Sequence, residues 1–185
     1  MKTEKEIEVK VKIDNIEKVK GDFERLGVVW SAPKPQIDCY YRLKDQFGAA
    51  QKPGSYILRI RQETNPTFTM KALTDRRGVW EERETKIENP KELEKILQKI
   101  GFVNVLTLHK KRTSGEYEKF KLEIDEIREL GNYLEVEVKG QDGEKIQNEI
   151  KKLFLSLGLP ERNIERRGYP EIIFEERGQK FEGQQ

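Results

Sequence analysis

The feature of this sequence that most limits its fold is a strict alternation of apolar and charged residues near its start. Ile7, Val9, Val11 and Ile13 are separated by single charged residues within the segment 4–13. Because successive side chains of a strand point to opposite sides, this segment is predicted to be a strand with one apolar face and one charged face. Several later segments show the same pattern, which favours a fold built largely from two-faced strands.

Three helices are predicted between the strands, from the helical spacing of apolar residues and from glycines at their ends. The first follows Asp14, its predicted cap, and stops at Gly27; the others cover about 90–100 and 143–157. The strand motif Glu6-Ile-Glu8-Val-Lys10 returns as Glu135-Val-Glu137-Val-Lys139, and a helix follows each copy. The repeat indicates two pseudo-equivalent halves of one domain, predicted over 1–174, with a tail over 175–185.

The charge balance of the chain is close to neutral and excludes a plain basic arm for nucleic acid. Its 185 residues include 36 Lys and Arg against 34 Asp and Glu. No apolar stretch reaches the roughly 18 residues that a membrane helix needs, and no apolar signal core follows Met1. Cys39 is the single cysteine, so no intrachain disulfide can form. We therefore expect a cytoplasmic protein without a membrane partner, and homodimer formation is left open.

Like charges on one strand face indicate a ligand. Glu6 and Glu8 should lie about 6.5 Å apart, and at an effective dielectric near 20 their repulsion is about 2.5 kcal/mol. Mg²⁺ or Mn²⁺ would relieve this repulsion, because both prefer oxygen ligands. Other strands carry the basic residues that suit a polyphosphate, namely Arg59, Arg61, Lys71, Lys110 and Arg112. A closed or nearly closed antiparallel barrel, charged inside and covered by helices outside, reconciles these faces.

The order of these motifs resembles the CYTH domain, which class IV adenylate cyclases share with thiamine triphosphatases and other triphosphate tunnel metalloenzymes. The resemblance begins with Glu6-x-Glu8-x-Lys10 and spans about residues 4–174. It continues through Gln36-Ile-Asp38-Cys-Tyr40-Tyr41, Leu58-Arg59-Ile-Arg61, Lys71, Lys110-Lys-Arg112, Leu122-Glu-Ile-Asp125 and Leu130-Gly131-Asn-Tyr133-Leu-Glu135-Val-Glu137. The likeness implies an α+β fold with an eight-stranded antiparallel β-barrel, a tunnel with a charged lumen and helices packed outside.

The resemblance also implies roles for individual residues. The implied metal ligands are Glu6, Glu8, Asp125, Glu135 and Glu137. The implied phosphate ligands are Lys10, Arg59, Arg61, Lys71, Lys110 and Arg112. Catalysis is implied for Glu6, Glu8, Lys10 and Arg112, with Mg²⁺ or Mn²⁺ as cofactor. Arg42 and Lys86 differ from the usual residues of the family, which bears on the choice of substrate.

Three functions remain open at this point. The first is an adenylate cyclase, a lyase that converts ATP to cyclic AMP and pyrophosphate. The second is a triphosphatase that hydrolyses inorganic triphosphate, thiamine triphosphate or a nucleoside triphosphate. The third is a non-catalytic module that binds polyphosphate or RNA, against which the two Glu-x-Glu pairs count because carboxylates repel phosphate. Nucleic acid is therefore not expected as a partner.

Other reactive residues are expected to be structural. His109 is the only histidine, which argues against a Ser/His/Asp triad. Cys39 has no nearby base to activate it, and no Gly-x4-Gly-Lys-Ser/Thr segment occurs. Trp30 and Trp80 either pack in the core or stack on a nucleobase, and packing is the favoured interpretation.

Overall fold

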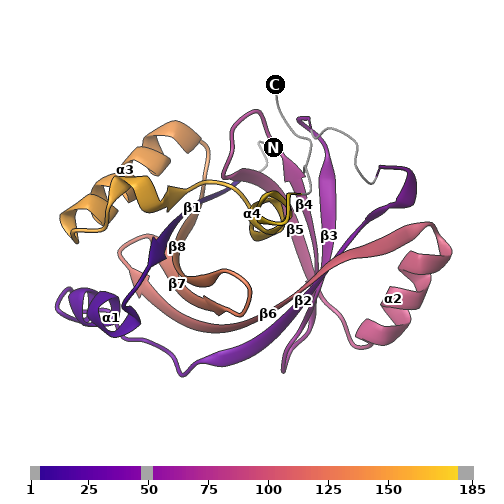
Figure 1. Cartoon of the computed structure of the whole chain (residues 1–185), viewed down its shortest axis with the longest axis horizontal. Helices are drawn as coiled ribbons and strands as arrows, with labels where there is room; N and C mark the ends of the chain where they lie inside the picture. Colours follow the sequence, from indigo (N-terminus) through magenta and orange to yellow (C-terminus); the bar gives the residue numbers. More distant parts are fainter. Residues whose placement is uncertain (1–4, 47–51, 179–185) are drawn as a thin grey trace. The chain divides into compact units, whose positions relative to one another are not determined.

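The computed structural model describes residues 5–46 and 52–178, which form two compact units. Unit 1 consists of residues 1–35 and 110–166, and unit 2 consists of residues 36–109 and 167–185. Each unit is therefore assembled from two separate segments of the chain. One long strand, β6 (Phe102–Tyr117), runs from unit 2 into unit 1 (Figure 1).

The strands of unit 1 follow the order β6, β7, β8, β1, β9, and every pairing in this unit is antiparallel. Their bounds are Phe120–Ile127 for β7, Gly131–Gly140 for β8, Lys5–Ile13 for β1 and Ile164–Glu165 for the short β9. The two copies of the repeated motif lie in β1 and β8, which are neighbours. The interpretation of the repeat as a mark of two halves is therefore wrong, because both copies belong to unit 1.

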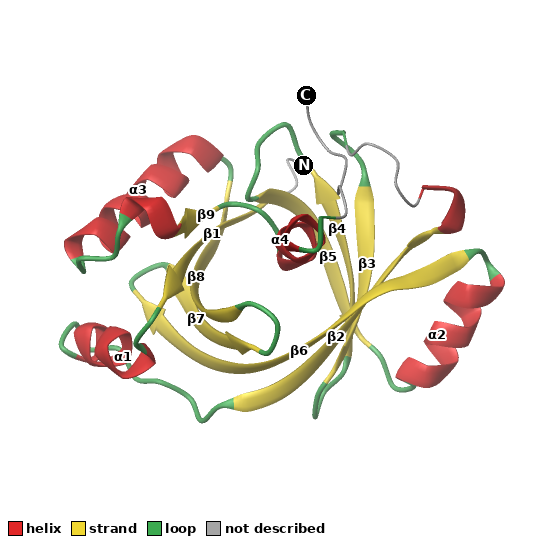
Figure 2. Ribbon diagram, in the orientation of Figure 1, coloured by secondary structure: helices red, strands yellow, loops and turns green. Residues whose placement is uncertain are grey.

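Helices α1 (Ile16–Glu24) and α3 (Gly143–Ser156) cover the apolar face of the unit 1 strands (Figure 2). Val9 and Val11 of β1 pack in one core with Phe23 of α1 and with Ile150 and Phe154 of α3, and all five are fully buried. Alternation along the strands then places their charged residues on the opposite face. The apolar and charged faces predicted for residues 4–13 are confirmed over Lys5–Ile13, and residue 4 lies outside the described residues.

Side-chain caps begin the three predicted helices. Asn89 caps α2 (Pro90–Lys99) and Asp142 caps α3, each through a side-chain oxygen that accepts a backbone N–H. At α1 the cap is Asn15, whose Oδ1 accepts from the Lys18 N–H at 2.9 Å, so the assignment of Asp14 was wrong by one residue. Asn and Asp cap equally well, and the helix start decides between them.

Unit 2 contains strands in the order β5, β4, β3, β2, again with antiparallel pairing. Their bounds are Val79–Lys86 for β5, Thr67–Leu73 for β4, Tyr56–Gln62 for β3 and Lys34–Leu43 for β2. Leu97 of α2 packs against Tyr41, Leu58 and Ile60 of these strands. Within the described residues, the eight long strands and four α-helices confirm the predicted eight-stranded antiparallel α+β fold.

A fourth helix, α4 (Tyr169–Glu176), was not predicted. Ile172, Ile173 and Phe174 are consecutive and all buried, so the segment lacks the helical periodicity that marked the other helices. The helix extends two residues into the predicted tail of 175–185, and residues 179–185 lie outside the described part of the chain. Among the helices described, none has the length and apolar character needed to cross a membrane.

Phe154→Ala should lower the free energy of unfolding by about 3 to 5 kcal/mol, because it opens a cavity in the unit 1 core. Leu155→Ala is the matched control on the same helix, since Leu155 is 43% exposed, and it should change stability far less. Urea unfolding followed by circular dichroism measures both values. Equal losses from the two variants would contradict the described packing of α3.

Candidate functional site

The charged face of unit 1 is organised around two neighbouring glutamates. In the β1–β8 register, Glu8 lies opposite Glu137 and Lys10 lies opposite Glu135. The two copies of the repeat run antiparallel, so the second glutamate of each copy meets the second glutamate of the other. Like charges directly opposite each other destabilise a sheet, and Glu8 is also buried. The repeated motif therefore creates a place that requires positive charge.

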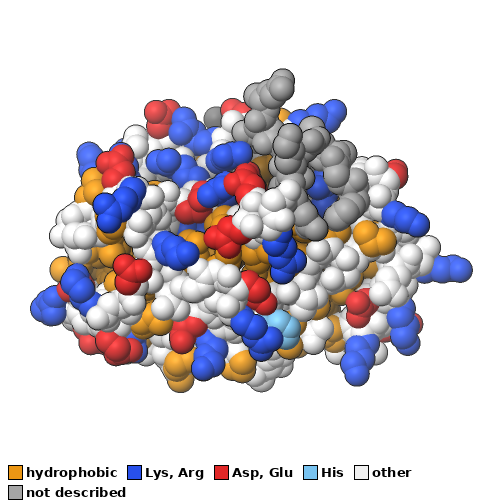
Figure 3. Space-filling view, viewed as in Figure 1, with side chains coloured by type: hydrophobic (Ala, Val, Ile, Leu, Met, Phe, Trp, Pro, Cys, Tyr) orange, Lys and Arg blue, Asp and Glu red, His pale blue; other side chains and the backbone are white. Residues whose placement is uncertain are grey.

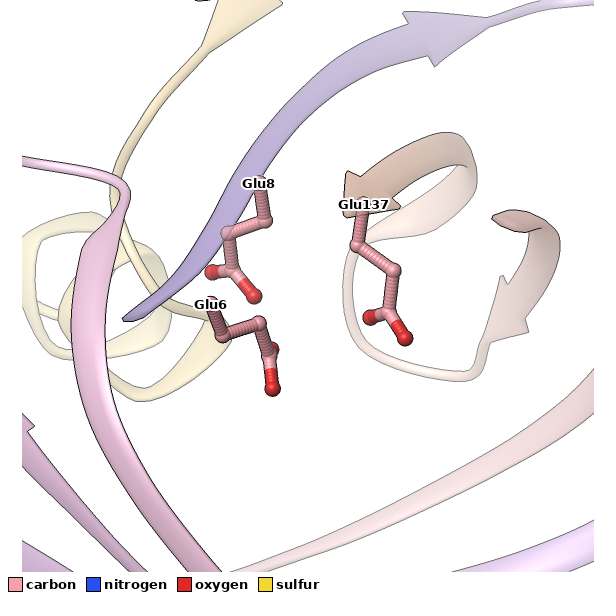
Figure 4. A group of neighbouring side chains, drawn as sticks. All are labelled: Glu6, Glu8 and Glu137. Atoms are coloured by element: carbon pink, nitrogen blue, oxygen red, sulfur yellow. The ribbon is translucent and has the colours of Figure 1, made fainter. Parts of the chain in front are cut away.

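Two groups of carboxylates in unit 1 have a geometry that suits a divalent cation. Glu6, Glu8 and Glu137 each offer an oxygen within 4.8 Å of the others, and their carboxylates extend into the same space (Figure 4). Glu123, Glu135 and Glu137 form a second group, whose carboxylate oxygens also lie within 4.8 Å of one another. All donors are carboxylate oxygens, which suit the hard cations Mg²⁺ and Mn²⁺. Glu137 belongs to both groups.

Lys10 neutralises part of this negative charge from within. Its Nζ lies 2.6 Å from Oε1 of Glu8 and 3.0 Å from Oε2 of Glu135, and the residue is only 1% exposed. A lysine so deeply buried must be paired, because an isolated ammonium would lose its hydration without compensation. Lys10 therefore fixes the positions of one carboxylate from β1 and one from β8.

Arg112 and Lys110 of β6 bind the carboxylate of Asp125 on β7. Nε of Arg112 lies 2.6 Å from Oδ1 of Asp125, Nη2 lies 2.5 Å from Oδ2, and Nζ of Lys110 lies 3.1 Å from Oδ2. Burial favours the neutral acid, but the charges of Arg112 and Lys110 outweigh it and lower the pKa of Asp125. Both oxygens of Asp125 thus face cations, and Asp125 belongs to neither carboxylate group.

Two charged residues of β7 also belong to this site. Neither was among the site residues expected from the sequence. Glu123 contacts the guanidinium of Arg112, and Lys121 lies 2.6 Å from Glu123 and 2.8 Å from Glu137. Burial lowers the pKa of Lys121, but Glu123 and Glu137 raise it more, so the ammonium is retained. Their positions could have been inferred, because Lys121 and Glu123 alternate in step with Asp125.

The donors of the unit 1 site suit a divalent cation. Its acidic residues are Glu6, Glu8, Glu123, Asp125, Glu135 and Glu137, and the cations in contact with them include Lys10, Lys110, Arg112 and Lys121. In both carboxylate groups every donor is a glutamate oxygen, the kind of ligand that Mg²⁺ and Mn²⁺ prefer. The residues present therefore fit a divalent metal.

Unit 2 brings together the three remaining cations predicted from the sequence, each held by an acidic residue. Arg61 of β3 binds Asp38 of β2 with both N–O distances below 3 Å, at 2.7 and 2.8 Å. Arg59 lies 3.2 Å from Oε2 of Glu84, and Nζ of Lys71 lies 3.1 Å from Oε2 of Glu82. Burial lowers the pKa of Arg59, but nearby acids, first Asp38, raise it well above its usual value. Arg59 therefore remains charged.

The other residues weighed in the sequence have structural surroundings. Trp30 contacts Phe23 edge to face at 5.9 Å between ring centroids, and its Nε1–H donates to the Lys20 carbonyl. Trp80 is buried, and its ring lies 5.9 Å from Nζ of Lys71. Burial raises the pKa of the Cys39 thiol, which disfavours the reactive thiolate. Burial also raises the pKa of Tyr40, beside Asp38 and Arg59, to about 12.

The sequence also matches known proteins over nearly its whole length. A protein of Methanocaldococcus jannaschii named "Putative adenylate cyclase MJ0240" is 31% identical over 173 residues, which cover 90% of this chain and 97% of that protein. The structure of the PH1012 protein from Pyrococcus horikoshii is 26% identical with a TM-score of 0.77, and covers 90% of this chain and 98% of that one.

A more distant structure shares the fold. It is HpAC1 from Hippeastrum, described as a "putative adenylyl cyclase" that reveals a dominant triphosphatase activity, at 17% identity and a TM-score of 0.64. The match covers 96% of this chain and 97% of the Hippeastrum chain. The model of the CYTH domain matches residues 4–169. The chain therefore belongs to the CYTH domain family.

Proposed function

We propose that this protein is an enzyme that acts on a triphosphate with the help of a divalent cation, and that its main activity is adenylate cyclase. The observation that carries the proposal is the carboxylate group of Glu6, Glu8 and Glu137, next to the buried cations Lys10 and Arg112. A metal-triphosphate complex needs both charges, because carboxylates bind the metal and cations bind the phosphate oxygens. The name of the Methanocaldococcus relative supports the cyclase.

In the proposed cyclase reaction, the 3′-oxygen of ATP forms a bond to the α-phosphorus and the bond to the pyrophosphate breaks. A divalent cation held by Glu6, Glu8 and Glu137 would lower the pKa of the 3′-hydroxyl. Lys10, Lys110 and Arg112 would stabilise the charge that develops on the phosphate oxygens. We assign phosphate binding in unit 2 to Arg59, Arg61 and Lys71, whose charged donors are of the same kind.

Hydrolysis of a triphosphate is the second candidate, and the tryptophans favour it. Aromatic side chains are a common surface for a nucleobase to stack on, yet Trp30 packs against Phe23 and Trp80 is buried. Inorganic triphosphate needs no such surface. In that reaction water would attack the terminal phosphorus. The same carboxylates would hold the divalent cation, and the same cations would bind the phosphate oxygens. The activity described for the Hippeastrum protein supports this candidate.

A non-catalytic RNA-binding module is the least supported function. On the face drawn in Figure 3, acidic and basic side chains are intermixed over the surface. Proteins that bind nucleic acid instead gather Lys and Arg into a basic stripe or patch. The carboxylates of the unit 1 site would also repel a phosphate backbone that brings no metal.

The reaction products decide between the candidates. Purified protein with ATP and Mg²⁺ or Mn²⁺ should release cyclic AMP and pyrophosphate in equal amounts, measured by liquid chromatography. Orthophosphate from inorganic triphosphate, with no cyclic AMP from ATP, would instead identify a triphosphatase. Binding of triphosphate without any product would contradict an enzymatic function.

The double variant Glu6→Gln/Glu8→Gln should abolish turnover and weaken Mn²⁺ binding, because it removes two of the three charged ligands while keeping the shape of the side chains. Calorimetric titration of Mn²⁺ gives a readout that does not depend on activity. Glu17→Gln/Glu24→Gln is the matched control on exposed positions of α1 and should behave as the unmodified protein. Unchanged turnover in the first variant would mean that the metal site is assigned to the wrong residues.

Arg59→Ala should weaken substrate binding by about 10 to 150 fold, since a hydrogen bond to a charged group contributes roughly 1.5 to 3 kcal/mol. Arg83→Ala is the control, because Arg83 of β5 is exposed and alternation along the strand places it on the other face from Glu82 and Glu84. Steady-state kinetics compare the two variants. A similar loss from both would contradict the assignment of strand faces in unit 2.

A further inference from the structure

Each unit contains one aspartate whose exposed fraction is 0%, Asp38 in unit 2 and Asp125 in unit 1. Each lies directly opposite an arginine on the neighbouring antiparallel strand. Asp38 of β2 is in register with Arg61 of β3, and Asp125 of β7 is in register with Arg112 of β6. Strand pairing thus places an aspartate opposite an arginine twice, at unrelated positions in the sequence.

The contact geometry of the two pairs is also the same. In each, one aspartate oxygen accepts from Nε and the other accepts from Nη2, at 2.7 and 2.8 Å for Arg61 and at 2.6 and 2.5 Å for Arg112. Two parallel hydrogen bonds fix the plane of a guanidinium as well as its position. The edge that carries Nη1 is turned away from the aspartate in both pairs.

Fold stability is a weak explanation for these pairs. A buried ion pair loses the hydration of both charges, and well-packed apolar residues of similar size often stabilise a protein equally well or better. The pairs also occupy the charged strand faces, where the arginines are the proposed phosphate ligands. A function in orienting the guanidinium groups accounts for both observations.

We propose that Asp38 and Asp125 are positioning residues that hold Arg61 and Arg112 in the orientation needed to bind phosphate. The proposal rests on the function proposed above. Among the described residues, Nη1 of Arg61 has no hydrogen-bonding partner, so this edge is presented to a ligand. Arg112 also contacts Glu123 through Nη1 and Glu135 through Nη2, and so links Asp125 to the carboxylates of the metal site. These contacts and the two to Asp125 occupy four of its five N–H groups, so that one N–H of Nη1 is left for a phosphate oxygen among the described residues.

The role assigned to Asp125 replaces the metal-ligand role that the family resemblance implies for it. Its oxygens bind Arg112 and Lys110, whereas the two groups suited to a metal consist of glutamates. The two roles differ in what a substitution changes. A metal ligand contributes to metal affinity in the absence of substrate, and a positioning residue contributes to phosphate affinity.

Asp38→Asn should weaken the binding of inorganic triphosphate with Mg²⁺ about tenfold, a loss typical of removing a partner that orients a ligand-binding group. Isothermal titration calorimetry measures the dissociation constant directly. Asp75→Asn is the matched control in unit 2, because Asp75 is exposed in the turn between β4 and β5. Asp125→Asn should weaken triphosphate binding by a similar factor but leave the affinity for Mn²⁺ alone within about twofold.

A double variant separates positioning from a purely structural role. Arg61→Ala leaves the carboxylate of Asp38 buried without its guanidinium partner, so Asp38→Asn/Arg61→Ala should melt at a higher temperature than Arg61→Ala. Its triphosphate affinity should equal that of Arg61→Ala, because Asp38 acts through Arg61. Additive losses in affinity would overturn the proposal for Asp38.

The remaining outcomes are equally decisive. Unchanged triphosphate affinity in Asp38→Asn, with tight binding by the unmodified protein, would overturn the proposal for Asp38 and leave the proposed function intact. Loss of Mn²⁺ affinity in Asp125→Asn would return Asp125 to the metal ligands. Failure of the unmodified protein to bind triphosphate with Mg²⁺ would overturn the proposed function and this inference together.

Discussion

The repulsion between Glu8 and Glu137 is the interaction on which the organisation of unit 1 depends. Their side chains are cross-strand neighbours in an antiparallel pair, with Cβ atoms about 5 Å apart. At that separation and an effective dielectric near 20, two like charges repel by about 3 kcal/mol. Lys10 offsets part of this cost by binding Glu8 and Glu135, and Lys121 offsets part by binding Glu137. The carboxylate oxygens gathered here suit a divalent cation.

The acidic and basic residues of the site stabilise one another's charged forms. Asp125 keeps a low pKa because Arg112 and Lys110 bind it, and Arg112 keeps a high pKa because acids surround it. A carboxylate at this depth would not remain charged alone, because burial favours the neutral acid. A site of this kind presents fixed charges to a ligand without reorganisation, which is the condition for electrostatic stabilisation of a transition state.

Much of the site was predictable because strand alternation is a local property. Glu6, Glu8 and Lys10 were placed on one face from their spacing alone, and so were Lys110 and Arg112, and the structure confirms both sets. The family resemblance implied that Glu135 and Glu137 belong with them, and the pairing of β1 with β8 brings them to the same strand face. The helices over 90–100 and 143–157 were predicted because their glycine stops lie next to their apolar stripes.

The sequence by itself determined which side chains share a strand face and which segments are strands or helices, because those properties depend on neighbours along the chain. Only the tertiary structure decided which carboxylate meets which cation. Asp125 meets Arg112, Asp38 meets Arg61 and Glu8 meets Glu137 through strand register, and register is fixed by the burial of whole apolar faces. For the same reason, α4 was missed, since its consecutive buried residues make sense only within the packed unit.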